Sequence, residues 1–139
     1  MAKTKLDFQA TSEWAETNVE NFFRPAKYTK FNSGQSNPTY LIETPKKKYV
    51  LRKKPEGVLL KSAHAVDREY RVQLALQSSL IPVPRMYAFC ADVSILGTEF
   101  YIMEHLEGTC FEDPRLDLVA QNCRYSIFEE MSNILAEIH

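Results

Sequence analysis

A seven-residue stretch, Lys-Tyr-Val-Leu-Arg-Lys-Lys at residues 48–54, constrains the fold of this chain more than any other. Its β-branched and aromatic residues predict a strand, and side chains alternate along a strand. Val50 and Arg52 are therefore expected on one face of a sheet, where an apolar residue and a permanent cation lie together. The opposite face is expected to carry Tyr49, Leu51 and Lys53.

The helix predicted next carries a carboxylate on its apolar side. It is expected over residues 63–80, with Ser62 as N-cap, because apolar residues recur there at helical spacing: Ala65, Val72, Leu76 and Leu80. Glu69 lies on this stripe, and a carboxylate there is costly unless a cation meets it. Arg52 is the nearest candidate along the chain. Alternatively, Glu69 lies at the edge of the stripe and reaches water beside the solvated Arg68 and Arg71, and periodicity does not decide between the two.

Composition indicates one globular domain, since the 139 residues are 45% hydrophobic and 25% charged. No apolar run is long enough to span a bilayer, and the N-terminal region carries acidic residues, so neither a membrane segment nor a cleaved signal is expected. The three cysteines are widely spaced and lack a Cys-x-x-Cys or a nearby histidine pair. This spacing favours reduced thiols in an intracellular compartment over a disulfide scaffold or a metal site.

Charge is distributed unevenly along the chain. Between Pro45 and Lys61 there are seven basic residues against one glutamate, whereas ten acids face only two arginines from Met86 onward. Such a basic block could meet phosphates. A lysine-rich turn with solvated sides is the alternative, preferred for Lys46, Lys47 and Lys54. Nucleic-acid binding is not expected, because the stretch is short and lacks interleaved aromatic residues.

The order of the other elements predicts an α+β fold. An amphipathic helix is expected over residues 12–23, ended by Pro25. Four strands are expected in addition to the cationic one, with Gly97 in the turn between the last two: 26–31, 39–43, 85–92 and 98–103. Five strands with one helix inserted after the third favour an antiparallel sheet over alternating βαβ units.

Two further segments indicate a ligand contact and an interface. The loop Ser33, Gly34, Gln35, Ser36, Asn37 is small and polar, so its backbone N–H groups could approach a phosphate. It matches neither a Walker loop nor a Gly-x-Gly-x-x-Gly turn, and from the residues alone a plain hairpin loop is the preferred interpretation. A long amphipathic helix is expected over residues 118–139, with a broad apolar face that nothing else in the chain is expected to cover.

This order of elements resembles the N-terminal lobe of the protein-kinase-like fold, and five motifs narrow the likeness to the aminoglycoside phosphotransferase family. The motifs occupy residues 31–41, 49–55, 62–70, 82–84 and 97–104, and the likeness covers residues 26–139. Within the family, the chain is most similar to the phosphotransferase-like domain ahead of the dehydrogenase in animal acyl-CoA dehydrogenase family members 10 and 11. The resemblance implies three parts: an N-terminal helix at 1–25, a kinase-like N-lobe at 26–107, and a hinge exit with the first helix of a C-lobe at 108–139.

The resemblance implies an ATP site on the face that carries Arg52. Arg52 stands where kinases place the lysine that holds the α- and β-phosphates, and Glu69 stands where the helix glutamate orients that cation. Backbone amides from Ser33 to Asn37 would cover the phosphates. Arginine in place of lysine is a departure, because a guanidinium is a planar fork and an ammonium a point charge.

The resemblance also implies where the adenine would lie. Val50 would pack over the base, and Met103 stands at the gatekeeper position. The backbone of Glu104 and Leu106 would form the hinge that faces the edge of the adenine.

The catalytic and metal-binding residues of the family are expected outside this sequence. The family's His-Gly-Asp motif and later aspartate follow the helix that reaches His139, and no His-x-Asp with a downstream asparagine occurs here. The resemblance therefore implies the ATP-binding N-terminal half of a small-molecule kinase, with Mg²⁺ bound only when the C-lobe is present. These residues alone are expected to bind a nucleotide weakly and to transfer no phosphoryl group.

The acceptor implied by the family is a hydroxylated small molecule, and fusion to a dehydrogenase suggests a hydroxyacyl-CoA. The alternative function is a non-catalytic module that binds a nucleotide or another protein, or self-associates through helix 118–139. Beyond an intracellular setting, the resemblance is compatible with the cytoplasm and, by analogy with the animal proteins, with mitochondria or peroxisomes.

Overall fold

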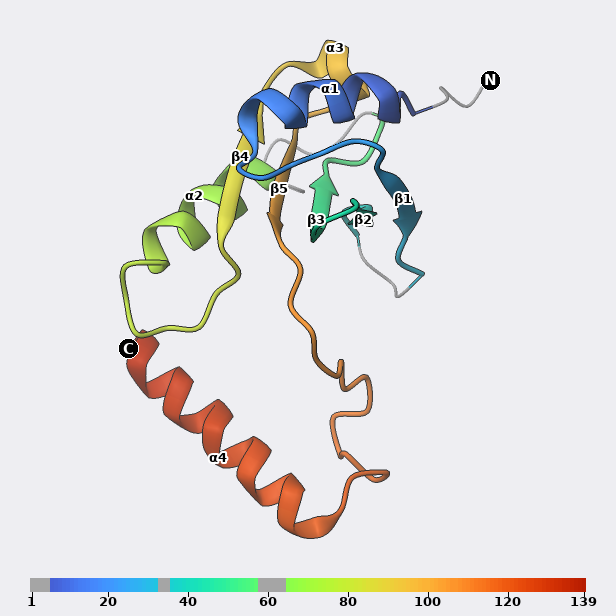
Figure 1. The fold of residues 1–139 in the computed structure, drawn as a ribbon. Helices are drawn as coiled ribbons and strands as arrows, with labels where there is room; N and C mark the ends of the chain where they lie inside the picture. The colour runs from blue at the N-terminus through green and yellow to red at the C-terminus, as the bar shows by residue number, and fades with distance from the viewer. Residues whose placement is uncertain (1–5, 33–35, 58–64) are drawn as a thin grey trace.

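The computed structural model describes residues 6–32, 36–57 and 65–139, whose centre is an antiparallel sheet of five strands (Figure 1). In chain order these are β1 (Lys27–Lys30), β2 (Thr39–Glu43), β3 (Lys48–Lys53), β4 (Met86–Cys90) and β5 (Phe100–Glu104). They lie in the order β1-β2-β3-β5-β4, which makes β3 the central strand. The predicted α+β class and all five predicted strands are confirmed.

In the described residues, four helices accompany the sheet: α1 (Phe8–Asn18), α2 (Val66–Leu76), α3 (Val93–Leu96) and α4 (Gln121–Ile138). The prediction missed α3, which replaces a simple turn between β4 and β5. The prediction that Gly97 lies in that connection is correct. Its φ of +83° is in the left-handed region and ends α3. The start predicted for α2, including the Ser62 N-cap, lies outside the described residues.

Helix α1 is shifted toward the N-terminus relative to the predicted range 12–23. Its first turn is capped by Asp7, whose Oδ1 accepts a hydrogen bond of 2.9 Å from the Ala10 amide. It ends before Val19, whose backbone is extended at φ −114° and ψ 123°. Val19 and Phe22 are nevertheless buried, so the apolar spacing identified core residues correctly and extended the helix too far.

The two faces of the sheet pack against different helices. Tyr49 and Leu51 are fully buried in a core that includes Ala15 of α1. The other face contributes Tyr101 to a smaller cluster around Val66 of α2. The predicted alternation of side chains along β3 is therefore confirmed. Because α1 packs on one face of the sheet, the face toward α2 is not covered by α1.

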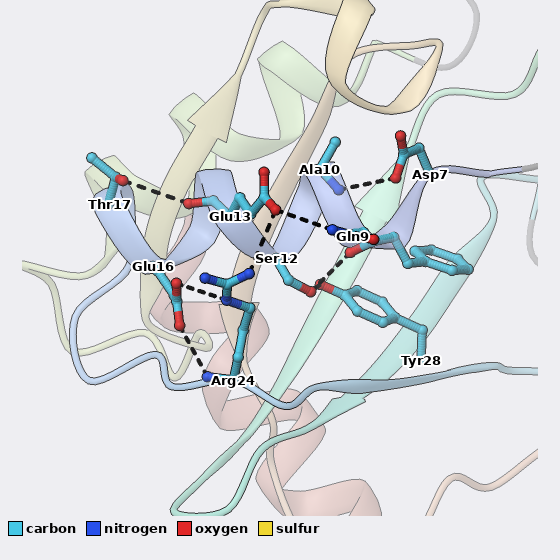
Figure 2. Close-up of polar contacts among 10 residues, drawn as sticks. Asp7, Gln9, Ala10, Ser12, Glu13, Glu16, Thr17, Arg24 and Tyr28 are labelled. Atoms are coloured by element: carbon cyan, nitrogen blue, oxygen red, sulfur yellow. Dashed lines mark hydrogen bonds and ion pairs between the residues drawn. The ribbon is translucent and has the colours of Figure 1, made fainter.

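A polar contact joins α1 to the edge strand β1, as Figure 2 shows. The Ser12 hydroxyl donates to the Phe8 carbonyl at 2.8 Å, so its contact of 2.9 Å with Tyr28 of β1 has the tyrosine as donor. Burial raises the pKa of Tyr28, which keeps this hydroxyl a donor. After the helix, Arg24 Nε lies 2.8 Å from Glu16 Oε2, so the chain turns back along α1 before it enters β1.

The apolar stripe predicted as the buried side of α2 is wrong. Val72 and Leu80 are 52% and 86% exposed. Val66, Tyr70 and Gln73 contact the sheet instead, with both the tyrosine ring and the glutamine amide against Tyr101. The physical reason is that α2 ends at Leu76, so Leu80 lies beyond it, and that Val66 and the Tyr70 ring supply the apolar contacts with the sheet.

Helix α4 lies apart from the sheet, after a long irregular segment that leaves β5 (Figure 1). None of its residues is buried, and its apolar side chains Met131, Leu135 and Ile138 are 58%, 56% and 55% exposed. Ile127 and Ile134 are partly exposed. The predicted uncovered apolar face is confirmed. Among the described residues, no helix is long and apolar enough to cross a membrane.

Candidate nucleotide site

An ion pair joins the central strand to α2. Arg52 Nε lies 2.9 Å from Glu69 Oε2, and Arg52 Nη2 donates to Glu69 Oε1 at 3.5 Å. The two side chains are only 23% and 33% exposed, so water screens the pair less than it would a surface pair. The predicted pairing of these residues is confirmed, and the alternative in which Glu69 simply reaches water is wrong.

Two more donors hold the same carboxylate. Asn37 Nδ2 donates to Glu69 Oε1 at 3.0 Å, and the Tyr101 hydroxyl donates to Glu69 Oε2 at 3.1 Å. Gln73 Nε2 in turn donates to the Tyr101 hydroxyl at 3.4 Å. We call Asn37, Arg52, Glu69, Gln73 and Tyr101 the Glu69 cluster, in which four chain segments meet at one carboxylate.

Sequence reasoning missed Tyr101 and Gln73, and it assigned Asn37 only to the backbone of a loop. A signal was nevertheless available, because Tyr101 lies directly opposite Arg52 once β3 and β5 are paired in register. Gln73 follows Glu69 by four residues on α2 and thus lies on the same side of the helix.

Burial and the neighbouring Glu69 carboxylate raise the pKa of Tyr101 to about 12. Only 1% of the Tyr101 residue is exposed. Because of its raised pKa, the hydroxyl keeps its proton and donates it to Glu69 throughout the neutral pH range. An unfolded chain would ionise the same tyrosine near pH 10.

We expect the free energy of unfolding to fall between about pH 10 and 12, partly because of Tyr101. In this range the unfolded state releases the tyrosine proton first, so each pH unit favours unfolding by at most about 1.4 kcal/mol. Tyr101→Phe should make this alkaline decline shallower, as measured by urea unfolding at a series of pH values. Tyr125→Phe, which changes an exposed hydroxyl of α4, is the matched control. An identical decline in Tyr101→Phe and the unsubstituted chain would contradict the expectation.

An apolar patch lies on the same face of the sheet as the ion pair. Val50 is 7% exposed and lies directly opposite Met103 of β5 on one side and Leu41 of β2 on the other. Met103 packs on the cluster that contains Met86. The structure thus brings Val50, Met103 and Arg52 onto one face of the sheet. Val50 precedes Arg52 by two residues on β3, and Met103 lies beside Val50 on β5.

The predicted hinge residues differ in their surroundings. The Glu104 amide donates to the Arg85 carbonyl at 2.8 Å. This amide therefore has a hydrogen-bond partner within the protein. Leu106 is 59% exposed in the segment that leaves β5.

The loop predicted to cover the phosphates is described only at its end, because Ser33, Gly34 and Gln35 lie outside the described residues. Ser36 is exposed at the edge of a cavity of about 560 Å³ between the loop and α2. Asn37 also lines it but is only 2% exposed, with its side chain turned to Glu69.

The site can therefore offer an oriented cation and an apolar surface, which suit a phosphate and a planar base. Glu69 is the carboxylate in the cluster, and both its oxygens already accept hydrogen bonds. Over the described part of the chain, no group of three or more His, Cys, Asp or Glu side chains is arranged to hold a metal ion.

A five-stranded sheet whose third strand carries a cation paired with a glutamate on the inserted helix defines a kinase-like N-terminal lobe. A solved structure from Ralstonia eutropha, named "putative aminoglycoside phosphotransferase", has this fold. It matches 96% of this chain with a TM-score of 0.80 and 38% identity, and the match covers 38% of that protein.

The sequence matches the model of the phosphotransferase enzyme family over residues 27–139, and the chain belongs to this family. It is 45% identical to "Probable acyl-CoA dehydrogenase IBR3" of Arabidopsis thaliana, over 97% of this chain and 17% of that protein. It is 44% identical to acyl-CoA dehydrogenase family member 10 of Mus musculus, over 83% of this chain and 11% of that protein. Human family member 11 is 43% identical over 97% of this chain and 18% of its own length. The chain thus spans less than a fifth of these relatives.

Proposed function

We propose that this chain is the ATP-binding part of a small-molecule phosphotransferase, which transfers the γ-phosphoryl group of ATP to a substrate hydroxyl. The observation that carries the proposal is the Arg52–Glu69 ion pair, set on the same sheet face as Val50 and Met103. An oriented cation beside an apolar surface is the arrangement by which kinase-like proteins hold the phosphates and the base of a nucleotide.

Each group has a chemical role in this proposal. Arg52 neutralises charge on the α- and β-phosphates, and Glu69 fixes the direction of its guanidinium. Val50 and Met103 contact the adenine. Because the Glu104 amide is engaged by Arg85, residue 104 offers its carbonyl to the adenine edge, and Leu106 offers its backbone. Amides from Ser33 to Asn37 would cover the phosphates.

Mg²⁺ and the acceptor would be held by residues outside these 139. ATP supplies the γ-phosphoryl group when bound, and positioning with metal charge provides most of the catalysis in such enzymes. The relatives named as acyl-CoA dehydrogenases support a hydroxyacyl-CoA as the acceptor of the parent protein. The free thiols of Cys90, Cys110 and Cys123 support an intracellular setting, in the cytoplasm, mitochondria or peroxisomes.

The proposal predicts that the chain binds ATP weakly and that Arg52→Ala weakens this binding about tenfold or more. A charge-assisted contact to phosphate typically contributes enough for such a change. Isothermal titration or NMR titration with ATP measures it, and Lys46→Ala, which removes an exposed cation of the β2–β3 turn, is the matched control. Equal ATP affinity for Arg52→Ala and the unsubstituted chain would contradict the assignment.

A second candidate function is a non-catalytic module that pairs through α4. The observation in its favour is the exposed apolar face that includes Met131, Leu135 and Ile138. It predicts a mass that rises with concentration in sedimentation equilibrium, and loss of this rise in Met131→Glu. A constant monomer mass, together with little binding of an apolar dye, would exclude this candidate.

A further inference from the structure

We propose that Asn37 and Tyr101 are positioning residues for ATP binding, which hold Glu69 and, through it, aim the Arg52 guanidinium at the phosphates. The inference rests on the proposed function of Arg52. It adds two residues whose role depends on their hydrogen bonds to another side chain.

The geometry of the carboxylate carries the inference. Oε1 accepts from Asn37 at 3.0 Å and from Arg52 Nη2 at 3.5 Å, while Oε2 accepts from Tyr101 at 3.1 Å and lies 2.9 Å from Arg52 Nε. Each oxygen is thus shared between the arginine and one neutral donor. Rotation of the carboxylate toward any other orientation would break at least one of these contacts, so the neutral donors fix the plane in which Arg52 is held.

The direction of the Tyr101 hydroxyl is itself fixed. Gln73 donates to the tyrosine oxygen, which leaves the single hydroxyl hydrogen for Glu69. Tyr101 is 1% exposed, so this hydrogen does not exchange its partner for water. A chain of hydrogen bonds from the half-buried Gln73 through the buried Tyr101 therefore presents one oriented donor to Oε2 of Glu69.

Asn37 links the same carboxylate to the loop before β2. Its side-chain amide donates to Glu69, while its backbone carbonyl accepts from Thr39 Oγ1 at 3.0 Å. Ser36 precedes it at the edge of the cavity. Asn37 thus ends the proposed phosphate-covering loop and also holds Glu69, which in turn orients Arg52. The loop and the cation, the two proposed sources of phosphate contacts, are therefore linked through Asn37.

Comparing ATP with adenosine separates positioning from a general loss of structure. Asn37→Ala and Tyr101→Phe should each weaken ATP binding about fivefold or more, because Arg52 is no longer held toward the phosphates. Adenosine, which lacks phosphates, should bind within twofold of its affinity for the unsubstituted chain. NMR titration measures both ligands, and the signal of the Arg52 Nε–H group should also move in the ligand-free variants.

Tyr28→Phe is the matched control, since it removes a tyrosine hydroxyl that contacts Ser12 on the α1 side of the sheet. It should leave the ratio of ATP to adenosine affinity and the Arg52 signal unchanged. Gln73→Ala is a milder variant for the case in which Asn37→Ala or Tyr101→Phe does not fold. It removes only the 3.4 Å contact to Tyr101 and should lower the ratio of ATP to adenosine affinity about twofold.

The outcomes distinguish this inference from the function on which it rests. If the unsubstituted chain binds no ATP, or Arg52→Ala binds it equally well, the proposed function fails. If Arg52→Ala loses ATP while Asn37→Ala and Tyr101→Phe keep it within twofold, only the positioning role is overturned. Equal weakening of ATP and adenosine in these two variants would likewise overturn it, because it would indicate a purely structural effect.

Discussion

Glu69→Leu is expected to destabilise the chain more than the double substitution Arg52→Met with Glu69→Leu. The single change leaves the Arg52 charge partly buried and without its carboxylate, whereas the double change removes the charge as well. Loss of one partner of a fully buried pair costs about 3–5 kcal/mol. Because these side chains are 23% and 33% exposed, we expect about 2 kcal/mol for Glu69→Leu and about 1 kcal/mol for the double variant.

Urea unfolding with a shared slope measures these differences as shifts of the midpoint. The control is the exposed Arg71–Asp67 pair of α2, whose side chains are 72% and 45% exposed at a separation of 3.2 Å. Asp67→Ala should change stability by less than about 0.5 kcal/mol. Costs that simply add for Arg52→Met and Glu69→Leu would contradict the coupling between the two charges.

No phosphoryl transfer is expected from these 139 residues at any concentration of Mg²⁺. Phosphoryl transfer depends on metal charge and on a positioned acceptor, and the sequence contains no His-x-Asp with a downstream asparagine to supply them. For the same reason, added Mg²⁺ should change the affinity for ATP by less than about twofold.

Release of ADP in a coupled assay measures this expectation, with hydroxyacyl-CoA and an aminoglycoside offered as acceptors. Arg52→Ala and Asp67→Asn provide the comparison. Turnover above the uncatalysed rate that is lost in Asp67→Asn and kept in Arg52→Ala would overturn every role assigned to the candidate nucleotide site.

The ion pair between Arg52 and Glu69 could be predicted from the sequence only as one of two alternatives, since apolar periodicity does not decide whether Glu69 is paired or reaches water. A permanent cation on a strand and a carboxylate on the following helix each need a partner, and chain order supplies one. The five strands were predictable, since alternation and turn residues are local signals. Asp7 was missed as the cap of α1 because the apolar spacing starts later than the helix does.

The face that α2 turns to the sheet could not be predicted from apolar periodicity. Tyr70 and Gln73 pack there because Tyr101 opposite them offers a ring and a hydroxyl, a contact between distant segments that periodicity does not encode. Val72, which apolar periodicity assigned to the buried side, is exposed and lines the cavity together with Glu69 and Gln73. The role of Asn37 was missed for the same reason, since its partner lies 32 residues further along the chain.

An NMR map of ATP-induced shifts tests the central claim most directly, namely that this face of the sheet holds an adenine nucleotide. We expect the largest shifts at Val50, Arg52, Met103 and Leu106, with those near Arg52 missing when adenosine replaces ATP. Shifts confined to the α1 side of the sheet, around Tyr28 and Tyr49, or no shifts at millimolar ATP, would contradict it.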